Sequence, residues 1–246
     1  MLPAVLTDAI ASGEWIRSDG SRTPLHANVT GREAQRLYDV VRTLQPDASV
    51  EIGLAQGVSA LAIAQALHDN ERGLHHVIDP FQSGAWENIG LANLARAGVE
   101  DRVHFYEAFP ETVVPSLPEV SFAFIDGWHV FDVTLGEFVL VDKRLAVGGL
   151  IGFHDLWLSS LQKVLRYILA NRKYRIHHDV APKAIASRQR LNRRLSRLVR
   201  RIPHADRIFR PEVLKPGPDL GLRRHNMIFI EKMGDDDREW QFHRQF

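Results

Sequence analysis

Short apolar runs alternate with amphipathic stretches along the middle of this sequence, and that alternation limits the chain to very few folds. The runs that we interpret as strands cover residues 49–53, 74–79, 102–107, 120–126 and 150–154. The stretches with helical spacing cover residues 59–67, 86–97 and 131–145. Strands joined through helices run parallel, and strands covered on both faces are largely apolar with little alternation, as these are. The pattern predicts an α/β fold with a parallel sheet between two layers of helices.

The flanking segments extend this pattern at both ends. Thr30-Gly-Arg-Glu33 has the form of a capping box, so we expect a helix to begin there and lead into the first strand. A further helix is expected at 158–171, and further strands at 174–180 and 226–232. We predict one domain over 1–246. Its parts are an N-terminal helical segment (1–47), a cofactor-binding and catalytic core (48–180), a basic insertion (181–224) and a final strand (225–232).

Composition excludes several classes of protein. The 246 residues are 45% hydrophobic and 25% charged, which suits a globular chain with one large core. The chain has no cysteine, which excludes disulfide scaffolds, zinc–thiolate sites and cysteine nucleophiles. Any metal must therefore bind to oxygen or imidazole. The sequence shows no signal-peptide pattern and no apolar stretch of about 18 residues, so we expect a cytoplasmic protein.

A glycine-containing loop follows the first predicted strand. It reads Glu51-x-Gly53-x-x-x-Gly57-x-Ser59, which fits neither the dinucleotide pattern G-x-G-x-x-G nor a Walker loop. The turn lies at the point of a parallel sheet where ligands bind, and Asp79 ends the next strand, where it could accept hydrogen bonds from both ribose hydroxyls. We expect a site for a nucleoside without a pyrophosphate. The alternative is a tight turn beside a surface aspartate.

Acidic and imidazole side chains end the fourth and fifth predicted strands. Asp126 and Asp155 should lie side by side, and two such carboxylates can bind a hard divalent cation, with Mg²⁺ the natural candidate. His129 is our candidate for the general base, because neutral imidazole is available near pH 7. Asp126 could instead be a helix cap. For His154, a supporting position behind the ligands is favoured over direct ligation, and the third ligand stays open.

Four motifs in order resemble the class I S-adenosylmethionine-dependent methyltransferases, and among them the metal-dependent O-methyltransferases acting on catechols and macrolide sugars. They are the glycine loop, Ile78-Asp79-Pro80, Phe124-Ile-Asp126-Gly-x-His129, and Gly148-Gly-x-Ile-x-x-His154-Asp155. The resemblance implies a Rossmann-like, doubly wound, seven-stranded, mostly parallel sheet whose last strand is antiparallel. It also implies cofactor contacts for a set of residues: Glu51, Gly53, Gln56, Gly57, Ser59, Asp79, Gln82, Glu107, Ala108 and Asp126.

Within that set, the resemblance assigns the methionine portion to Glu51, Gly53, Gly57 and Ser59, the ribose to Asp79, and the adenine edge to the Glu107-Ala108 turn. It departs from the catechol-type pattern at Leu156, where those relatives carry an asparagine. Trp86, Trp128 and Trp157 lie near the predicted strand ends, and Trp128 and Trp157 are candidates for contact with the acceptor. Core cover is the alternative for all three tryptophans.

The basic insertion holds the charge that the overall composition hides. Residues 183–210 carry ten basic residues and one acidic residue, a net +9, whereas the whole chain has a net charge of +1 and the remainder therefore −8. Apolar residues recur at helical spacing within 191–202, which predicts an arginine-rich helix. It could pack on the acidic body, close over the acceptor as a lid, or dock on anionic lipid or nucleic acid. The resemblance favours a lid or acceptor-recognition element.

These observations lead to one functional hypothesis and two alternatives. The chain is expected to use S-adenosylmethionine and Mg²⁺, or another hard divalent cation, to methylate a hydroxyl of a sugar, glycoside or oligosaccharide. Among the relatives, sugar-type enzymes carry a histidine at the position of His129 and catechol-type enzymes a lysine, which favours sugars. The alternatives are a catechol or phenol acceptor, and a methyltransferase docked on nucleic acid or membrane. Nucleic acid is not favoured, and a homodimer is left open.

Overall fold

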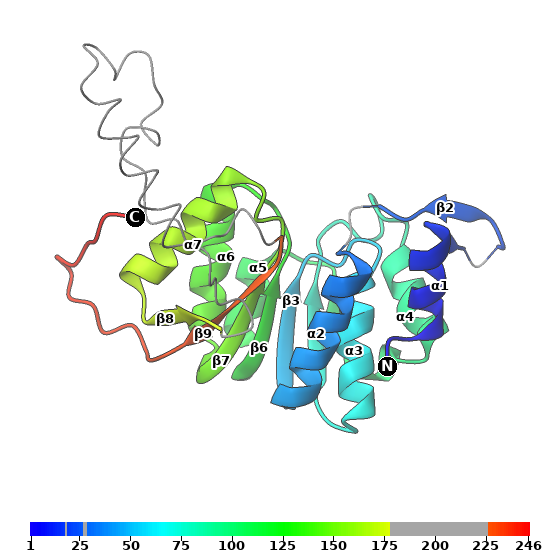
Figure 1. The fold of residues 1–246 in the computed structure, drawn as a ribbon, viewed down its shortest axis with the longest axis horizontal. Helices are drawn as coiled ribbons and strands as arrows, with labels where there is room; N and C mark the ends of the chain where they lie inside the picture. The colour runs from blue at the N-terminus through cyan, green and yellow to red at the C-terminus, as the bar shows by residue number, and fades with distance from the viewer. Residues whose placement is uncertain (18, 27–28, 178–225) are drawn as a thin grey trace, which may run out of the picture.

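A seven-stranded sheet forms the centre of the computed structural model, which describes residues 1–17, 19–26, 29–177 and 226–246 (Figure 1). Its strands are β3 (Ala48–Ile52), β4 (Leu74–Ile78), β5 (Val103–Tyr106), β6 (Val120–Ile125), β7 (Leu145–Phe153), β8 (Tyr174–Ile176) and β9 (Ile228–Lys232). Their order is β5-β4-β3-β6-β7-β9-β8. The first five strands are parallel, and β9 runs antiparallel to both β7 and β8. This confirms the predicted fold class.

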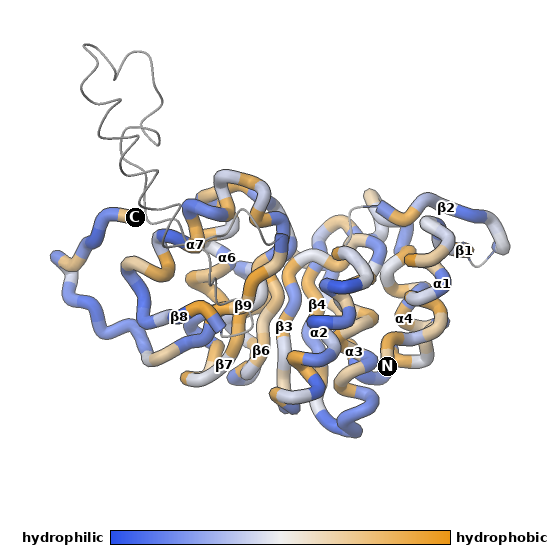
Figure 2. The backbone as a smooth tube through the Cα atoms, in the orientation of Figure 1, coloured by the Kyte–Doolittle hydropathy of each residue, from blue (hydrophilic) through white to orange (hydrophobic). Residues whose placement is uncertain are grey.

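Helices cover both faces of the sheet. They are α1 (Ala4–Ser12), α2 (Gly31–Leu44), α3 (Val58–Asp69), α4 (Ile89–Ala97), α5 (Pro110–Val113), α6 (Phe131–Asp142) and α7 (Ser159–Asn171), with short 3-10 turns η1 (Glu100–Arg102) and η2 (Val114–Ser116). Alternate side chains of each strand enter different cores: Phe122 and Phe124 pack with α1 to α4, and Ala123 and Ile125 with α5 to α7. Figure 2 shows the hydrophobic residues gathered in the strands between these layers.

Most predicted boundaries agree with the structure to within a residue or two, and four shift further. The capping box is present: Thr30 accepts a hydrogen bond from the Glu33 backbone N–H, and the Glu33 carboxyl accepts one from the Thr30 backbone. The helix expected from residue 86 begins at Ile89, after a left-handed Asn88. The helix expected to reach residue 145 ends at Asp142, and β7 begins earlier than expected. The strand expected over 174–180 is β8, which ends at Ile176.

The N-terminal segment contains more than helices. After α1, strands β1 (Glu14–Ile16) and β2 (Arg22–Pro24) form a two-stranded antiparallel hairpin that the sequence pattern did not predict. Each strand has three residues, too few to display a periodic pattern. The hairpin is held by burial instead, because the Trp15 side chain is only 1% exposed.

A buried polar network ties the last two strands to the end of α6. The Asp142 carboxyl accepts a hydrogen bond from Tyr174 Oη at 2.5 Å and pairs with Arg172. Lys232 Nζ donates to the backbone oxygens of Asp142, at 2.8 Å, and of Leu145, at 2.9 Å. Burial, followed by the hydrogen bond to Asp142, raises the pKa of Tyr174. Since all these groups are paired, the network fixes the antiparallel end of the sheet.

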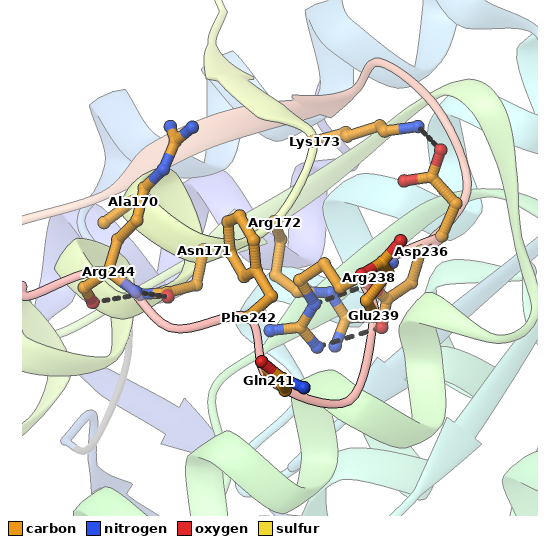
Figure 3. Close-up of a pocket in the computed structure, with 11 residues that line it drawn as sticks. Ala170, Asn171, Arg172, Lys173, Asp236, Arg238, Glu239, Gln241, Phe242 and Arg244 are labelled. Carbon is orange, nitrogen blue, oxygen red and sulfur yellow. Dashed lines mark hydrogen bonds and ion pairs between the residues drawn. The ribbon is translucent and has the colours of Figure 1, made fainter.

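The C-terminal segment returns to the end of α7 and closes a small pocket there (Figure 3). Asn171 Nδ2 donates to the backbone oxygen of Arg244 at 3.0 Å, and Lys173 Nζ pairs with Asp237 Oδ2 at 2.6 Å. The pocket has a volume of about 510 Å³. These contacts anchor the segment after β9.

Two further expectations concern the basic insertion and membrane-spanning helices. The whole basic insertion (181–224), with the arginine-rich helix predicted within 191–202, lies outside the described residues. In the part of the chain that the structure describes, no helix is both long and apolar enough to cross a membrane.

Candidate active site

The carboxyl ends of the parallel strands bring the predicted site residues to one edge of the sheet. The pairing aligns Ile52 of β3 with Ile78 of β4 and with Ile125 of β6, and Ile125 in turn with Phe153 of β7. The residues that follow these strand ends are Gly53, Asp79, Asp126 and His154. The juxtaposition inferred from the sequence is therefore present in the fold.

Gly53 is required by the close approach of β3 and β6. Its φ is +96°, and a Cβ atom at this position would lie 2.4 Å from the backbone oxygen of Asp126. Gly57 has a φ of +86°, and a Cβ there would lie 3.1 Å from Gly90 Cα. Any side chain at Gly53 would thus push apart the loops that carry the expected cofactor and metal contacts.

Asp79 holds the glycine loop in place. Its Oδ2 accepts hydrogen bonds from the backbone N–H groups of Leu54 and Ala55, both at 3.0 Å, and its Oδ1 accepts one from Phe81 at 2.9 Å. A carboxylate has about four acceptor positions. Asp79 therefore keeps some acceptor capacity, and it lines a large cavity at this edge of the sheet, called the main cavity below. Its contact with ribose hydroxyls stays a prediction.

Glu51 and Ser59 are bonded to each other inside the protein. Ser59 Oγ donates to one carboxyl oxygen of Glu51, and His75 Nε2 lies 2.8 Å from the other. Glu51 is fully buried, and burial raises its pKa although His75 and Ser59 act in the opposite direction. Neither Glu51 nor Ser59 lines the main cavity, so their direct contact with a cofactor stays a prediction.

Gln56 links the glycine loop to the N-terminal hairpin. Its Oε1 accepts hydrogen bonds from Trp15 Nε1 at 3.2 Å and from the His26 backbone at 3.0 Å, and its Nε2 donates to Pro24 O at 3.0 Å. With its amide occupied and only 2% of the residue exposed, Gln56 is placed to brace the loop from behind.

Gln82 and Glu107 also bond to neighbouring protein groups. Gln82 is fully buried and its Nε2 donates to the Ala55 backbone oxygen at 2.8 Å. The Glu107 carboxyl accepts hydrogen bonds from the Ser83 backbone, at 2.8 Å, and from the Ser83 hydroxyl. Neither Glu107 nor Ala108 lines the main cavity, whereas the next residue, Phe109, does.

Asp126, His154 and Asp155 form the cluster at the ends of β6 and β7. Each offers a ligand atom, and these atoms lie within 4.8 Å of one another. His154 Nδ1 lies 3.3 Å from Asp126 Oδ1 and 3.4 Å from Asp155 Oδ1. Asp155 has a left-handed backbone, with φ of +53°, which turns its carboxyl back toward the cluster. For His154 a supporting position was favoured over direct ligation, because the strand pattern alone does not reveal which way its ring faces; in the structure its ring nitrogen lies among the ligand atoms of the cluster.

Two residues outside the predicted set hold the far side of the His154 ring. His154 Nε2 lies 2.9 Å from the Asn226 amide nitrogen and 3.5 Å from Glu33 Oε2. Asn226 Oδ1 is buried and has no hydrogen-bond partner among the described residues. With the oxygen and nitrogen of this amide exchanged, Nε2–H would have an acceptor, and the Nδ1 lone pair would be available to a cation bound between the two aspartates.

The cluster holds protons in the absence of a cation. Burial would lower the pKa of His154, but hydrogen bonds with Asp126 and Glu33 outweigh it and raise the pKa to about 10. For Glu33, burial is likewise outweighed by His154 and Thr30, which lower its pKa to about 2. The cluster is therefore an imidazolium between carboxylates, and a metal ion would have to displace that proton.

His129 completes the group from the loop after β6. Its Nε2 lies 3.2 Å from both Asp126 Oδ1 and Asp155 Oδ2. The hydrogen bond with Asp126 is the main cause that raises the pKa of His129. Unlike His154, this side chain is about one third exposed, so it lies where a substrate can reach it.

Two carboxylates and an imidazole are a donor set that fits a divalent cation. Carboxylate oxygens suit Mg²⁺ and Mn²⁺, and the imidazole raises the affinity for first-row transition metals. Asp126 and Asp155 are thus placed as the sequence predicted. His154, which directly follows β7, could supply a third ligand.

The main cavity has a volume of about 1280 Å³ and opens beside this cluster. Gly53, Asp79 and Asp126 line it. Most of the wall is apolar or aromatic, contributed by the loops after β4, β5 and β6 and by α6: Pro80, Phe81, Ala85, Trp86, Phe109, Pro110, Trp128, Phe131, Val133, Leu135, Val139 and Leu140. The volume exceeds that of most single-ligand pockets. It has room for a nucleoside cofactor and a second ligand.

The three tryptophans occupy different positions. Trp128 is 58% exposed and its ring centroid lies 5.8 Å from that of Phe81 at the cavity wall. Trp86 also lines the cavity. Trp157 is 68% exposed and its Nε1 donates to Asp155 Oδ1 at 3.0 Å, outside the cavity lining. Trp128 is therefore the tryptophan best placed for contact with an acceptor.

Comparisons with known proteins agree with the fold. Residues 50–156 match a family model described as "Methyltransferase domain". Caffeoyl-CoA O-methyltransferase from Populus kitakamiensis is 29% identical over 138 residues, 53% of this chain and 56% of the plant protein. Caffeoyl-CoA O-methyltransferase 1 from Eucalyptus globulus is 31% identical over 156 residues, 55% of this chain and 58% of its own. The chain thus spans little more than half the length of these curated relatives.

Solved structures show the same fold at low sequence identity. The O-methyltransferase TomG from Streptomyces achromogenes, in complex with S-adenosylmethionine, has a TM-score of 0.57 at 16% identity and covers 71% of this chain and 81% of its own. An O-methyltransferase from Bacillus cereus, in complex with S-adenosylhomocysteine, has a TM-score of 0.55 at 17% identity, with 70% and 80% covered. This chain has the fold of the class I S-adenosylmethionine-dependent methyltransferases. The match of residues 50–156 to the methyltransferase-domain model agrees with the motifs found in the sequence.

Proposed function

We propose that the protein is an S-adenosylmethionine-dependent, metal-assisted O-methyltransferase that acts on a hydroxyl of a sugar, glycoside or oligosaccharide. The observation that carries the proposal is the position of His129, whose Nε2 lies 3.2 Å from both Asp126 and Asp155. A base at this point can reach a hydroxyl that approaches the two carboxylates.

Each part of the site has a separate task in this proposal. Gly53 and Asp79 line the part of the cavity that would bind the nucleoside and orient its sulfonium methyl toward the carboxylates. Asp126, Asp155 and His154 would hold the cation, which stabilises negative charge on the acceptor oxygen when bound. His129 would take the hydroxyl proton at Nε2, and the apolar wall would exclude water from the reacting groups.

The aromatic cavity wall and the imidazole of His129 support the choice of a sugar-type acceptor. Aromatic rings such as Trp128 and Phe81 offer flat apolar faces on which a sugar ring can stack. A second candidate function keeps the same site and takes a catechol or other phenol. It is favoured by the caffeoyl-CoA O-methyltransferase relatives and by the aromatic lining itself.

Methyl transfer from labelled S-adenosylmethionine to two acceptor panels, simple glycosides and catechols, tests the proposal. We expect transfer to glycosides to require Mg²⁺ or Mn²⁺ and to stop in EDTA. Asp126→Asn and Asp155→Asn should each lower turnover at least about a hundredfold. Asp155→Asn should leave S-adenosylhomocysteine affinity within about twofold, because Asp155 does not line the cavity. Full activity in EDTA would refute the metal-assisted mechanism, and transfer to catechols alone would establish the second candidate.

The remaining expectations stay proposals. A small-molecule or oligosaccharide acceptor is the partner that the cavity best accommodates, and a homodimer and a cytoplasmic location stay predictions. Docking on a membrane or on nucleic acid depended on the basic insertion, which lies outside the described residues. Filter binding to RNA and flotation with anionic vesicles, each repeated at high salt, would test it.

A further inference from the structure

Glu137 is a buried carboxyl in the wall of the main cavity, and none of the motifs includes it. It lies on α6, is 6% exposed, and faces the cavity that Gly53, Asp79 and Asp126 also line. A glutamate buried in an apolar wall is costly unless its oxygens are satisfied, so its presence calls for a partner.

Only part of the Glu137 carboxyl has such a partner in the protein. The backbone N–H of Trp128 hydrogen-bonds to it, whereas Oε2 is buried and has no partner among the described residues. Oε1 lies on the side of Gly127, the residue before Trp128, at 2.9 Å from the position that a Cβ on Gly127 would take. Gly127 thus leaves the space that Glu137 occupies, and one acceptor oxygen remains for a ligand.

The position of Glu137 in the cavity indicates that it would contact the adenine end of the cofactor. In the sheet order β5-β4-β3-β6-β7, the cation cluster lies after β6 and β7, whereas Phe109 and Glu111 line the cavity after β5. With the sulfonium methyl at the cluster and the ribose at Asp79, the base extends toward the β5 end. Helix α6 packs against α5 there, and the charge of Glu111 acts on Glu137 together with those of His129 and Asp126.

Glu107, which was expected to contact the adenine edge, is hydrogen-bonded to another protein residue instead. The Glu107 carboxyl bonds to the Ser83 backbone at 2.8 Å and to its hydroxyl, and does not line the cavity. The cavity wall in this region is otherwise apolar, with Phe81 and Phe109 in edge contact at 6.0 Å between ring centroids. An adenine bound there would find flat apolar cover for its faces but few polar groups for its amine.

We propose that Glu137 accepts a hydrogen bond from the exocyclic amine of the cofactor's adenine and so selects adenine over 6-oxopurines. This inference rests on the proposed function, because it assumes that the cavity binds an S-adenosyl cofactor. The ligand amine would satisfy Oε2, and Trp128 N–H would keep the carboxyl in position.

The constraint from Trp128 makes the effect of glutamine specific. In Glu137→Gln, the side-chain oxygen must accept from Trp128 N–H, so the NH₂ group replaces Oε2 on the ligand side. An NH₂ group repels an exocyclic amine and donates to a carbonyl oxygen. The variant should therefore favour a 6-oxopurine.

Calorimetric titration of the full chain with S-adenosylhomocysteine and with S-inosylhomocysteine, whose purine carries a 6-oxo group, tests this at pH 8. Burial raises the pKa of Glu137 to about 7, and pH 8 lies above that value, so the carboxyl is mostly ionised in the titration. We expect the wild-type protein to bind the adenosyl ligand about ten to a hundred times more tightly. Glu137→Gln should reduce that ratio at least about tenfold or reverse it, and Glu119→Gln, an exposed carboxyl before β6, should retain it.

Two failures can be told apart. If the wild-type protein binds neither ligand, the proposed function falls and the inference falls with it. If it binds both ligands equally, or if Glu137→Gln keeps the wild-type ratio, only the role of Glu137 is refuted. The wild-type comparison needs no substitution, and circular dichroism checks that the variant is folded.

Discussion

Replacing Glu137 by glutamine should stabilise the ligand-free protein above neutral pH and have much less effect below pH 5. Burial raises the pKa of this carboxyl from its ordinary value of 4.5 to about 7, with Trp128 N–H acting in the opposite direction. A raised carboxyl pKa means that folding favours the protonated form. Its contribution to stability is fully present below about pH 4.5 and is lost as the pH rises to about 7.

The size of the effect follows from the two pKa values. A rise from 4.5 to about 7 corresponds to about 3 kcal/mol of lost stability at high pH, of which about 2.5 kcal/mol falls between pH 5 and pH 8. Glutamine keeps the shape and has no charge to bury. For a chain of this length, the difference amounts to roughly 6 to 10 °C in melting temperature at pH 8.

Urea unfolding of wild type and variant at pH 5, 6, 7 and 8, without ligands, measures the difference directly. Other titrating groups cancel in the comparison, and Glu119→Gln controls for the loss of one exposed negative charge. The quantity to follow is the unfolding free energy of the variant minus that of the wild type. A difference that stays constant within about 0.5 kcal/mol over this pH range would refute the burial argument for Glu137.

Three further predictions concern the cluster and the sheet. His129→Ala should lower kcat by roughly 10²- to 10⁴-fold in steady-state assays while S-adenosylhomocysteine affinity is unchanged; full turnover would remove His129 as the base. Glu33→Gln should lower the pKa of His154 by about one unit in NMR titrations, because it removes a negative partner 3.5 Å away; an unchanged His154 would show that Asp126 alone sets its charge. Asp142→Ala should cost about 3 to 5 kcal/mol in urea unfolding, because it removes the buried partner shared by Arg172 and Tyr174 and leaves Arg172 only Asp236, at 3.3 Å; a loss below about 1 kcal/mol would contradict that account.

Local patterns were sufficient to predict the fold and the outline of the site. The strands are recognisable because both faces are buried, and the start of α2 because its capping box is a contact between near neighbours. Asp126 and Asp155 could be paired from sequence alone, since parallel strands bring their carboxyl ends to one edge.

The rest depends on contacts between distant segments. The β1–β2 hairpin is held by Trp15 and by Gln56, 41 positions further along the chain, and short strands carry no pattern of their own. The occupied side chain of Glu107 depends on a loop 24 positions earlier. The buried Glu137 could not be recognised because a glutamate in an amphipathic helix normally indicates the solvent face. In each case tertiary packing decides which atoms are free.

The capping box at the start of α2 has a consequence for how this protein can evolve. The Glu33 carboxyl accepts a hydrogen bond from the Thr30 backbone N–H and also lies beside His154. Glutamine satisfies a capping box nearly as well as glutamate, so helix stability alone would let position 33 drift between the two. The charge requirement of His154 removes that freedom. Positions 33 and 154 should therefore change together among homologous chains, although 121 positions separate them.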